Sequence, residues 1–183
     1  MSDMSREEAR LIQRAKDGDG AALGKIYDLH QPAIYRYILY RVGSDAAAED
    51  LTSEVFVRLV DNLDGFTYRG RPLLAWLYTI ARNLVSDHHR LVGRVQRIPL
   101  DETIAAQTPD PEGVADLAIN YERLAVALDQ LTEDQRQVIL LRFIEGLDNQ
   151  TVAQVLGKSY GAVKALQHRG LAALRRVFDS GVV

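Results

Sequence analysis

Residues 71–90 read Arg-Pro-Leu-Leu-Ala-Trp-Leu-Tyr-Thr-Ile-Ala-Arg-Asn-Leu-Val-Ser-Asp-His-His-Arg, and this stretch predicts a long amphipathic helix. Pro72 suits the first turn, where its missing N–H costs nothing. Apolar residues at three- and four-residue steps predict the buried stripe: Leu73, Trp76, Leu77, Ile80, Leu84 and Val85. The opposite face carries Tyr78, Thr79, Arg82, Asn83, Ser86 and Arg90. That face has the donors, cations and aromatic plane that bind an unpaired nucleic-acid strand, although a core helix with a solvated face fits the same pattern.

Three more helices are predicted before this stretch, over residues 5–16, 21–42 and 46–63. Ser5 and Glu8 fit a capping box for the first, and Pro32 lies within the second, where it could bend the helix. The third has a stripe at four-residue steps, widened by two further residues: Leu51, Val55, Leu59, Leu63, Phe56 and Val60. Its outward side carries Glu49, Asp50, Glu54 and Arg58. The acids either complement the helix dipole or form a face that docks on a partner.

The loop at residues 66–71, Phe-Thr-Tyr-Arg-Gly-Arg, leads directly into the 71–90 stretch. Aromatic rings and guanidinium groups interleaved in this way can stack on bases that have left a duplex. The alternative is a surface loop, and for Phe66 itself we expect a role in the core.

The chain after the 71–90 stretch breaks at residues 99–112, which contain Pro99, Pro109 and Pro111 together with acids. Helical periodicity returns over residues 117–128, and Thr132 with Gln135 forms a capping-box start for a helix over 132–144. The sequence therefore predicts an all-α fold. Two small helical domains, residues 1–98 and 114–183, are joined by an acidic, proline-containing linker at 99–113.

The second domain ends in a predicted helix-turn-helix. Asp148 can cap a short helix, Gly157-Lys158-Ser159 forms the turn, and a longer helix follows from Tyr160 to about Phe178. The second helix of such a motif contacts base edges through its N-terminal residues. Its exposed residues are expected to be Tyr160, Lys164, Gln167, His168 and Arg169, with Arg175 and Arg176 further along. A basic helical hairpin without a DNA target is the alternative interpretation.

Charge is segregated along the chain although the formal net charge is only −3. Residues 65–98 hold six Lys and Arg against one Asp, and residues 135–183 hold seven basic against three acidic residues. Between them, residues 99–134 hold one Arg against nine Asp and Glu. Two basic blocks on either side of an acidic one predict two contacts with a polyanion, since what matters is the local field.

Other classes of protein are disfavoured by composition and motifs. The chain has no cysteine, which excludes disulfides and thiolate chemistry. It has no N-terminal apolar signal region and no run of ~20 apolar residues, so we expect a cytoplasmic protein without membrane insertion. Asp87-His88-His89 lacks the spacing that points two histidines at one metal ion. No phosphate-binding loop or nucleophile elbow is found. We therefore expect no enzyme activity, catalytic residue, metal site or cofactor.

Taken in order, several strings of this chain resemble the extracytoplasmic-function (ECF) sigma factors of the bacterial sigma-70 family. They are Ala48-Glu-Asp-Leu-Thr-Ser-Glu-Val-Phe56, Ala75-Trp-Leu-Tyr-Thr-Ile-Ala-Arg-Asn83, Leu131-Thr-Glu-Asp-Gln-Arg-Gln-Val-Ile139 and Gly161-Ala-Val-Lys164. The resemblance covers residues 15 to 178 approximately. It implies an alternative sigma factor that binds the RNA polymerase core, directs it to promoters and helps to melt the minus-ten element.

The resemblance also assigns roles to particular residues of this chain. It implies contact with the clamp helices of the polymerase largest subunit by Asp50, Leu51, Glu54 and Arg58. It implies minus-ten recognition and melting by Tyr68, Arg69, Arg71, Tyr78, Arg82 and Asn83. It implies minus-thirty-five recognition by Tyr160, Lys164, His168 and Arg169. Trp76 resembles the core tryptophan of the family. Ala165, Leu166 and Gln167 depart from the Ser-Arg that many members have, so the base preference at minus thirty-five does not transfer.

The partners that the resemblance implies are the polymerase core, including the flap of its second-largest subunit, promoter DNA and an anti-sigma factor. The acidic linker could also occupy the RNA-exit path of the polymerase. A stand-alone helix-turn-helix regulator with an N-terminal sensor or dimerisation domain is the competing hypothesis. A pure interaction protein, such as an anti-sigma factor, is disfavoured by the two basic blocks.

Overall fold

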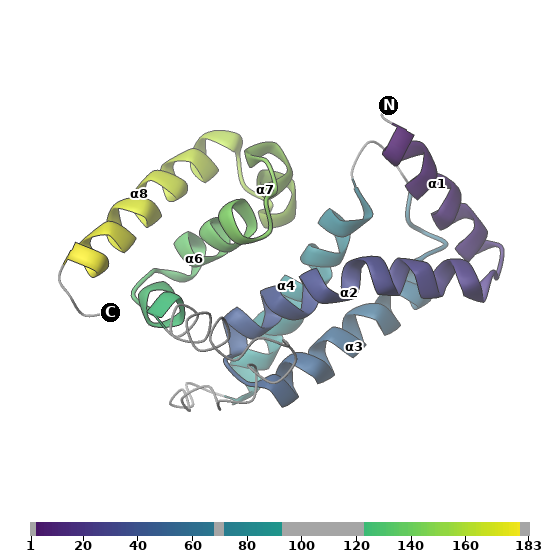
Figure 1. The fold of residues 1–183 in the computed structure, drawn as a ribbon, viewed down its shortest axis with the longest axis horizontal. Helices are drawn as coiled ribbons and strands as arrows, with labels where there is room; N and C mark the ends of the chain where they lie inside the picture. Colours follow the sequence, from purple (N-terminus) through teal and green to yellow (C-terminus); the bar gives the residue numbers. More distant parts are fainter. Residues whose placement is uncertain (1–2, 68–71, 93–122, 180–183) are drawn as a thin grey trace, which may run out of the picture. The chain divides into compact units, whose positions relative to one another are not determined.

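A computed structural model of the chain describes residues 3–67, 72–92 and 123–179, with side chains from residue 6 onward (Figure 1). Regular structure in these ranges is helical throughout, which confirms the predicted all-α class. The chain divides near Gln96 and Arg97 into two compact units, which are described separately. The predicted linker at 99–113 lies outside the described residues, and its bounds stay a prediction.

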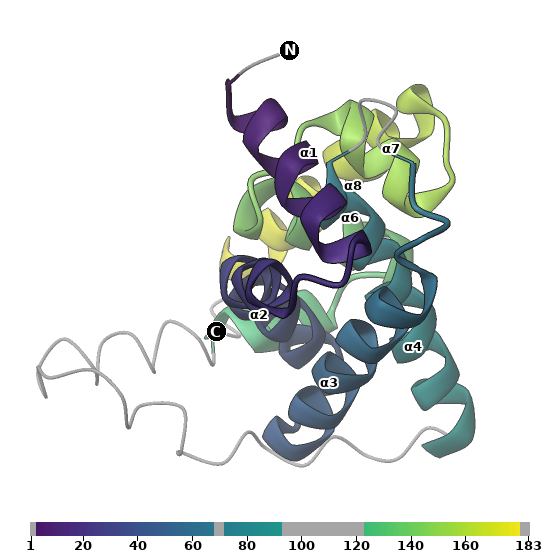
Figure 2. The same ribbon diagram turned by 90° about the vertical axis from the view of Figure 1, so that its right-hand side faces the viewer.

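The described residues of the first unit form the helices α1 (Asp3–Lys16), α2 (Gly20–Val42), α3 (Asp45–Asn62) and α4 (Leu73–Val92). Helix α2 packs against the other three, and α3 also packs against α4, as the two views of the ribbon show (Figures 1 and 2). Pro32 lies inside α2, which continues through it as one helix. The predicted capping box of Ser5 is wrong, because α1 begins two residues earlier.

The turn between α2 and α3 is built by residues with distinct backbone demands. Gly43 ends α2 with a φ of 67°, a left-handed conformation that glycine adopts without steric cost. Ser44 then caps α3, and its side chain accepts a hydrogen bond from the Ala47 N–H at 3.4 Å. The Tyr35 hydroxyl donates to Asp45 Oδ1 at 2.9 Å, which links α2 to the first turn of α3. Burial and this bond raise the pKa of Tyr35 to about 12.

The core of the first unit lies where α2, α3 and α4 meet. Its large, fully buried side chains include Ile26, Ile34, Tyr37, Ile38, Val55, Leu59, Leu73, Leu77 and Tyr78. The predicted stripe of α3 is buried at Val55, Phe56, Leu59 and Leu63. Leu51 and Val60 are the exceptions, since Leu51 is half-buried and Val60 is 51% exposed. The ring of Phe56 contacts the ring of Tyr27 on α2, with 4.7 Å between the ring centroids.

The described part of the second unit starts with helical residues 123–129 and continues through α6 (Glu133–Ile139), η2 (Leu140–Ile144), α7 (Asn149–Leu156) and α8 (Tyr160–Asp179). The capping box predicted at Thr132 and Gln135 is present, with both reciprocal hydrogen bonds. Helix α6 runs directly into η2, one π-helical segment. Helices α6 and α8 pack closely at Gly170, where a Cβ atom would lie 3.0 Å from Ile139 Cγ1.

Helices α7 and α8 form the predicted helix-turn-helix. Asp148 caps α7 by accepting the Thr151 N–H at 2.7 Å, and Gly157 ends it with a φ of 63°. Ser159 Oγ accepts the Ala162 N–H at 3.2 Å and so caps α8. Lys158, within the turn, pairs with Asp134 at 2.9 Å and ties the turn to the start of α6.

Candidate nucleic-acid interface

Helix α4 buries a wider arc than its sequence stripe predicts. Leu73, Leu77, Leu84 and Val85 are buried as expected, whereas Trp76 and Ile80 are only half-buried. Ala75, Tyr78 and Ala81 are fully buried in addition. The arc is displaced because α4 packs against both α2 and α3, so residues beside the stripe meet a second helix.

Tyr78 is therefore a core residue, and its predicted place on the nucleic-acid face is wrong. Its exposed fraction is 0%, and its ring packs edge-on against Tyr37 of α2 with centroids 5.2 Å apart. The Tyr37 hydroxyl in turn accepts a hydrogen bond from Arg41 Nη1 at 3.1 Å within the same core. Tyr78 thus packs α4 against α2.

The remaining polar residues of that face lie on one side of α4. Asn83 is exposed and Arg82 is half-buried. Thr79 is half-buried, and its hydroxyl donates to the Ala75 carbonyl at 3.0 Å. Spacings of three and four residues place these side chains on a common face. This face presents an amide and a guanidinium, which can both donate hydrogen bonds to bases and phosphates.

Phe66 and Trp76 form the link between the loop and α4. Their rings stack with centroids 4.9 Å apart and an interplanar angle of 29°. Phe66 is buried, as expected for a residue that fills the core, and Trp76 is half-buried beside it. The stack fixes where the loop leaves the core. Tyr68, Arg69 and Arg71, the predicted base-stacking residues, lie outside the described residues.

Helix α1 holds the chain on both sides of residues 68–71, a role that the sequence did not reveal. Lys16 Nζ donates to the carbonyls of Asp64 at 2.9 Å and Phe66 at 2.6 Å. On the other side, Glu8 Oε1 accepts the Leu73 N–H at 3.2 Å, at the first residue of α4. A carboxylate at a helix N-terminus also complements the helix dipole. The sequence pattern predicts this glutamate as part of a cap for its own helix, and that prediction is wrong.

Glu8 also faces a buried histidine of α2. His30 Nε2 lies 4.0 Å from Glu8 Oε1, and His30 is 6% exposed. Desolvation lowers the pKa of His30 from 6.5 to about 4, so the ring is neutral near pH 7. Desolvation also raises the pKa of Glu8 from its ordinary value, although the hydrogen bond from Leu73 opposes this change. Both shifts follow from burial between α1, α2 and α4.

The four predicted docking residues of α3 share one face. Asp50 is exposed, and Leu51, Glu54 and Arg58 are half-buried. Arg58 Nε lies 2.8 Å from Glu54 Oε1, an ion pair one helical turn apart. Exposed ion pairs of this kind contribute little to stability. The face also exposes Val57, which is 52% exposed. Acids beside accessible apolar surface suit contact with a basic, partly apolar partner.

The predicted recognition face of α8 is exposed except at Gln167, which is half-buried. Tyr160, Lys164 and His168 follow one another at four-residue steps, and all three are exposed, as is Arg169. Lys164 Nζ lies 6.0 Å from the centroid of the Tyr160 ring, at the outer limit of a cation–π contact. Val163, Leu166 and Gly170 are buried on the opposite side. This places a cationic, hydrogen-bonding row where a recognition helix carries it.

The Asp87-His88-His89 string is divided among different contacts. Asp87 pairs with Arg90, and His89 Nε2 lies 3.1 Å from the Arg41 carbonyl oxygen of α2. The described residues contain no cluster of three potential metal ligands. They also contain no helix long and apolar enough to cross a membrane.

Comparison with known families gives one match for each unit. Residues 26–95 match Sigma-70 region 2, and residues 121–174 match Sigma-70, region 4. The first match spans α3 and α4, and the second spans the helix-turn-helix. The order of the two matches is the order of the two folded units along the chain.

Individual proteins resemble the chain over most of its length. It is 40% identical over 169 residues to the ECF RNA polymerase sigma factor BldN of Streptomyces coelicolor, covering 91% of this chain but only 64% of BldN. It is 34% identical to the ECF RNA polymerase sigma factor SigD of Mycobacterium tuberculosis, covering 90% of this chain and 81% of SigD. A solved structure of the sigma factor RpoE with the anti-sigma factor NepR, from Bartonella quintana, aligns with a TM-score of 0.68 and 26% identity. That alignment covers 85% of this chain and 96% of RpoE.

Proposed function

The chain belongs to the ECF sigma factors of the sigma-70 family, and we propose that it is a promoter-specificity subunit of bacterial RNA polymerase. The observation that carries this proposal is the pairing, in one chain, of an acidic α3 face in the region 2 unit with a cationic α8 face in the region 4 unit. A subunit of this kind works in the cytoplasm, where the polymerase acts. The polymerase supplies the catalysis, and we assign no catalytic residue to this chain.

We assign polymerase docking to the α3 face formed by Asp50, Leu51, Glu54 and Arg58. The clamp helices of the largest subunit are its partner. The Glu54–Arg58 pair holds both side chains in one geometry, and partner contacts that exclude water from it would strengthen it. The flap of the second-largest subunit is the proposed partner of the region 4 unit.

We assign minus-ten recognition to Arg82 and Asn83 on α4, together with Tyr68, Arg69 and Arg71 in the loop before it. Taking a base out of the stack costs a few kcal/mol, so the protein must offset this cost with stacking and hydrogen bonds. The contacts of α1 on both sides of the loop support this role, because they fix its ends. Reduced freedom before binding lowers the ordering cost on binding.

We assign minus-thirty-five recognition to the α8 row of Tyr160, Lys164, His168 and Arg169. Bases are read in the major groove by side chains near the start of such a helix, while further cations hold phosphates. Joining this unit to the region 2 unit by one linker raises the effective concentration of each at its own DNA element. Two weak contacts can thereby give one stable complex. We also propose that an anti-sigma factor binds this chain, since RpoE is seen with NepR.

Run-off transcription tests the proposal directly. The full chain is mixed with core polymerase from its host and fragmented host DNA, and the transcript starts are sequenced. We expect starts that depend on the chain and share elements near minus ten and minus thirty-five. Absence of any chain-dependent transcript would exclude the proposal. Tight binding of duplex DNA by the chain without polymerase would instead favour a stand-alone regulator.

Asn83→Ala tests the assignment of α4 within the same assay. Asn83 is exposed and lies outside the proposed docking face of α3. Removal of its amide should therefore leave binding to the polymerase core enzyme unchanged while promoter opening slows. The matched control is Ser86→Ala, an exposed residue one turn later on α4. Loss of core affinity in Asn83→Ala would contradict the assignment.

A further inference from the structure

Helix α1 carries two side chains that tie together segments far apart in the sequence, and none of the assigned surfaces includes this helix. The Sigma-70 region 2 match begins at residue 26, after the end of α1 at Lys16. Among the described helices α1 packs closely on α2 alone, and its Ile12 is buried. Two long side chains, Glu8 and Lys16, extend its contacts to other segments.

Lys16 ties the end of α1 to the segment that follows α3. Its Nζ donates to the carbonyl oxygens of Asp64 at 2.9 Å and Phe66 at 2.6 Å. An ammonium group has three donors, so one lysine can satisfy both carbonyls. The Phe66 ring in turn stacks on Trp76 near the start of α4, with centroids 4.9 Å apart. Lys16 thereby holds in place the ring on which the start of α4 is stacked.

Glu8 ties α1 directly to the start of α4. Its Oε1 accepts the N–H of Leu73, the first residue of α4, at 3.2 Å. The first N–H groups of a helix have no partner within the helix, so this carboxylate supplies one from outside. Leu73 is fully buried, and the same Glu8 oxygen lies 4.0 Å from Nε2 of the buried His30. The start of α4 is therefore held at its backbone by Glu8 and at its first aromatic ring through Lys16.

The direction of the start of α4 decides where its exposed residues point. Asn83 follows Trp76 by seven residues, or about two helical turns, so both lie on the same side of α4. The intervening residues are helical throughout, so a rotation of Trp76 about the helix axis rotates Asn83 with it. Resting on the proposed function, we propose that Glu8 and Lys16 are positioning residues of promoter opening. They act without touching DNA, by holding α4 in the direction in which Asn83 meets the unpaired strand.

The opening kinetics of the holoenzyme test this role. The variants are Lys16→Met and Glu8→Met, which keep a long side chain but remove the donor or the acceptor. Opening is followed by the permanganate reactivity of unpaired thymines, on a promoter found by run-off transcription. One hydrogen bond shifts a conformational equilibrium by about 2-fold to 10-fold. Lys16→Met loses two such bonds and should slow opening about 10-fold, and Glu8→Met about 3-fold. The affinity for core polymerase and the affinity of the closed complex should stay unchanged.

Conservative variants separate positioning from a general loss of structure. Lys16→Arg keeps donors for both carbonyls, and Glu8→Gln keeps an oxygen that can accept the Leu73 N–H. Both should therefore recover most of the opening rate that the methionine variants lose. Opening by Lys16→Arg as slow as that by Lys16→Met would contradict a role that depends on these hydrogen bonds.

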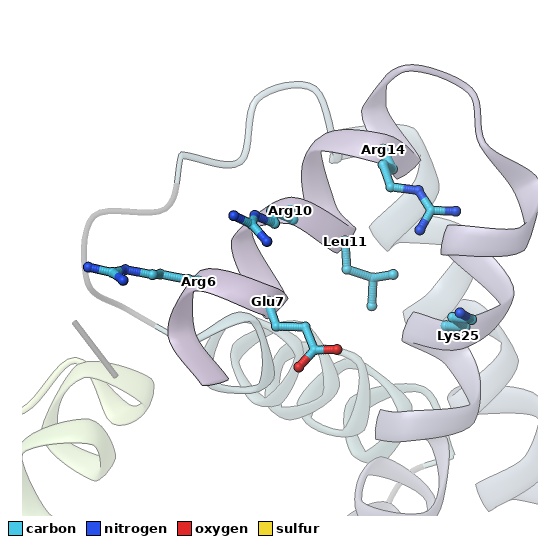
Figure 3. A pocket seen from close by; sticks show the side chains of 6 residues that line it. All are labelled: Arg6, Glu7, Arg10, Leu11, Arg14 and Lys25. Carbon is cyan, nitrogen blue, oxygen red and sulfur yellow. The ribbon is translucent and has the colours of Figure 1, made fainter. Parts of the chain in front are cut away.

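Arg10→Met is the charge control, because Arg10 lies on the same helix and is exposed. It lines a pocket of α1 and α2 whose other residues are Arg6, Glu7, Leu11, Arg14 and Lys25 (Figure 3). Its loss removes a cation from α1 but none of the hydrogen bonds to the start of α4, so the opening rate should not change. Equal slowing by Arg10→Met and Lys16→Met would indicate a general effect of charge and overturn the positioning role.

Trp76 reports the tie without any DNA, because it is the single tryptophan of the chain. In the full chain by itself, acrylamide should quench Trp76 fluorescence more strongly in Lys16→Met than in the wild type, since Phe66 is held less firmly against the indole. Arg10→Met should be quenched as the wild type is. Equal quenching of all three proteins would overturn the link from Lys16 through Phe66 to α4.

Failure of the positioning role can be told apart from failure of the proposed function. If the wild-type chain directs no transcription with core polymerase, the proposed function fails, and a role in promoter opening fails with it. If the wild type opens the promoter and Lys16→Met opens it at the same rate, the positioning role alone is overturned. Loss of core affinity in Lys16→Met at an unchanged opening rate would also overturn it and identify α1 as a contact for the polymerase.

Discussion

Helices α4 and α8 are both twenty residues long, and each carries a polar face that the sequence assigns to DNA. In α8 no residue of that face is fully buried, although Gln167 is half-buried, whereas in α4 one of its residues, Tyr78, lies in the core. The difference arises from the number of packing partners. Helix α4 packs on α2 and α3, while α8 packs chiefly on α6. A hydrophobic stripe therefore predicts the exposed face of a helix well when one neighbour covers it.

The largest effect on stability is expected for Tyr78→Ala, which tests this comparison of α4 with α8. Removing a fully buried aromatic side chain that packs on Tyr37 should lower the free energy of unfolding of the region 2 unit by about 3–5 kcal/mol. Chemical denaturation followed by circular dichroism measures it. Asn83→Ala, on the exposed face of the same helix, should change this free energy by less than about 0.5 kcal/mol. Equal, small effects of both substitutions would return Tyr78 to the DNA-contacting face.

A second test compares the acid stability of the two units. The region 2 unit buries His30, which takes up a proton near its ordinary pKa of 6.5 when unfolded but only near pH 4 when folded. The contribution of neutral His30 to the stability of this unit should therefore be fully present above pH 6.5 and be lost as the pH drops from 6.5 toward 4. By proton linkage the loss at pH 4.5 is on the order of 2 kcal/mol.

The His30→Gln variant isolates this effect. The difference between wild type and variant cancels most of the contribution of Glu8, whose raised pKa acts in the opposite direction over acid pH. Denaturant titrations at several pH values should show a flatter profile for the variant. The region 4 unit should keep its stability over the range from pH 6.5 to 5, and identical profiles for variant and wild type would contradict the burial of a neutral His30.

The sequence predicted the helices and caps of the second unit closely because those features are local. Thr132 with Gln135, Asp148 and Ser159 each satisfy N–H groups within four residues of themselves. The local capping box predicted at Ser5 fails because α1 begins at Asp3, and the contacts that the sequence missed join distant segments. Glu8 caps α4 rather than its own helix, and Lys16 holds carbonyls 48 and 50 residues away. Nothing in the local pattern encodes such partners.

The buried arc of α4 also differs from the predicted stripe because of contacts with distant segments. Tyr has an apolar ring and a polar hydroxyl, so its place beside a stripe fits either burial or exposure. Only the presence of Tyr37 on a second helix decides between them. The ordered strings of residues were enough to indicate the ECF sigma factor family. They did not indicate whether the Tyr78 side chain is buried or exposed.

A third test addresses the close approach of α8 to α6 at Gly170. Gly170→Ala places a Cβ 3.0 Å from Ile139 Cγ1 and 3.2 Å from Cδ1, so it should cost about 1–3 kcal/mol through overpacking. Gly161→Ala is the matched control, because its Cβ would meet no atom within 4 Å and alanine favours the helix. Thermal unfolding should show a lower midpoint for the first and an equal or higher one for the second. Restored stability in Gly170→Ala/Ile139→Val would locate the strain between α6 and α8.

The smallest effect on stability is expected at Lys164, on the exposed face of α8. Lys164→Ala removes an exposed side chain whose Nζ lies 6.0 Å from the centroid of the Tyr160 ring, so the free energy of unfolding should change by less than about 0.5 kcal/mol. Binding of holoenzyme to a promoter duplex with its minus-thirty-five element should nevertheless weaken. The same variant should bind a forked DNA without that element as the wild type does. The control is Arg175→Ala, which removes a cation nearer the end of α8. It should weaken the binding of either DNA only slightly. Because α8 exposes the face that α4 partly buries, Lys164→Ala should separate DNA binding from folding completely, whereas Tyr78→Ala cannot.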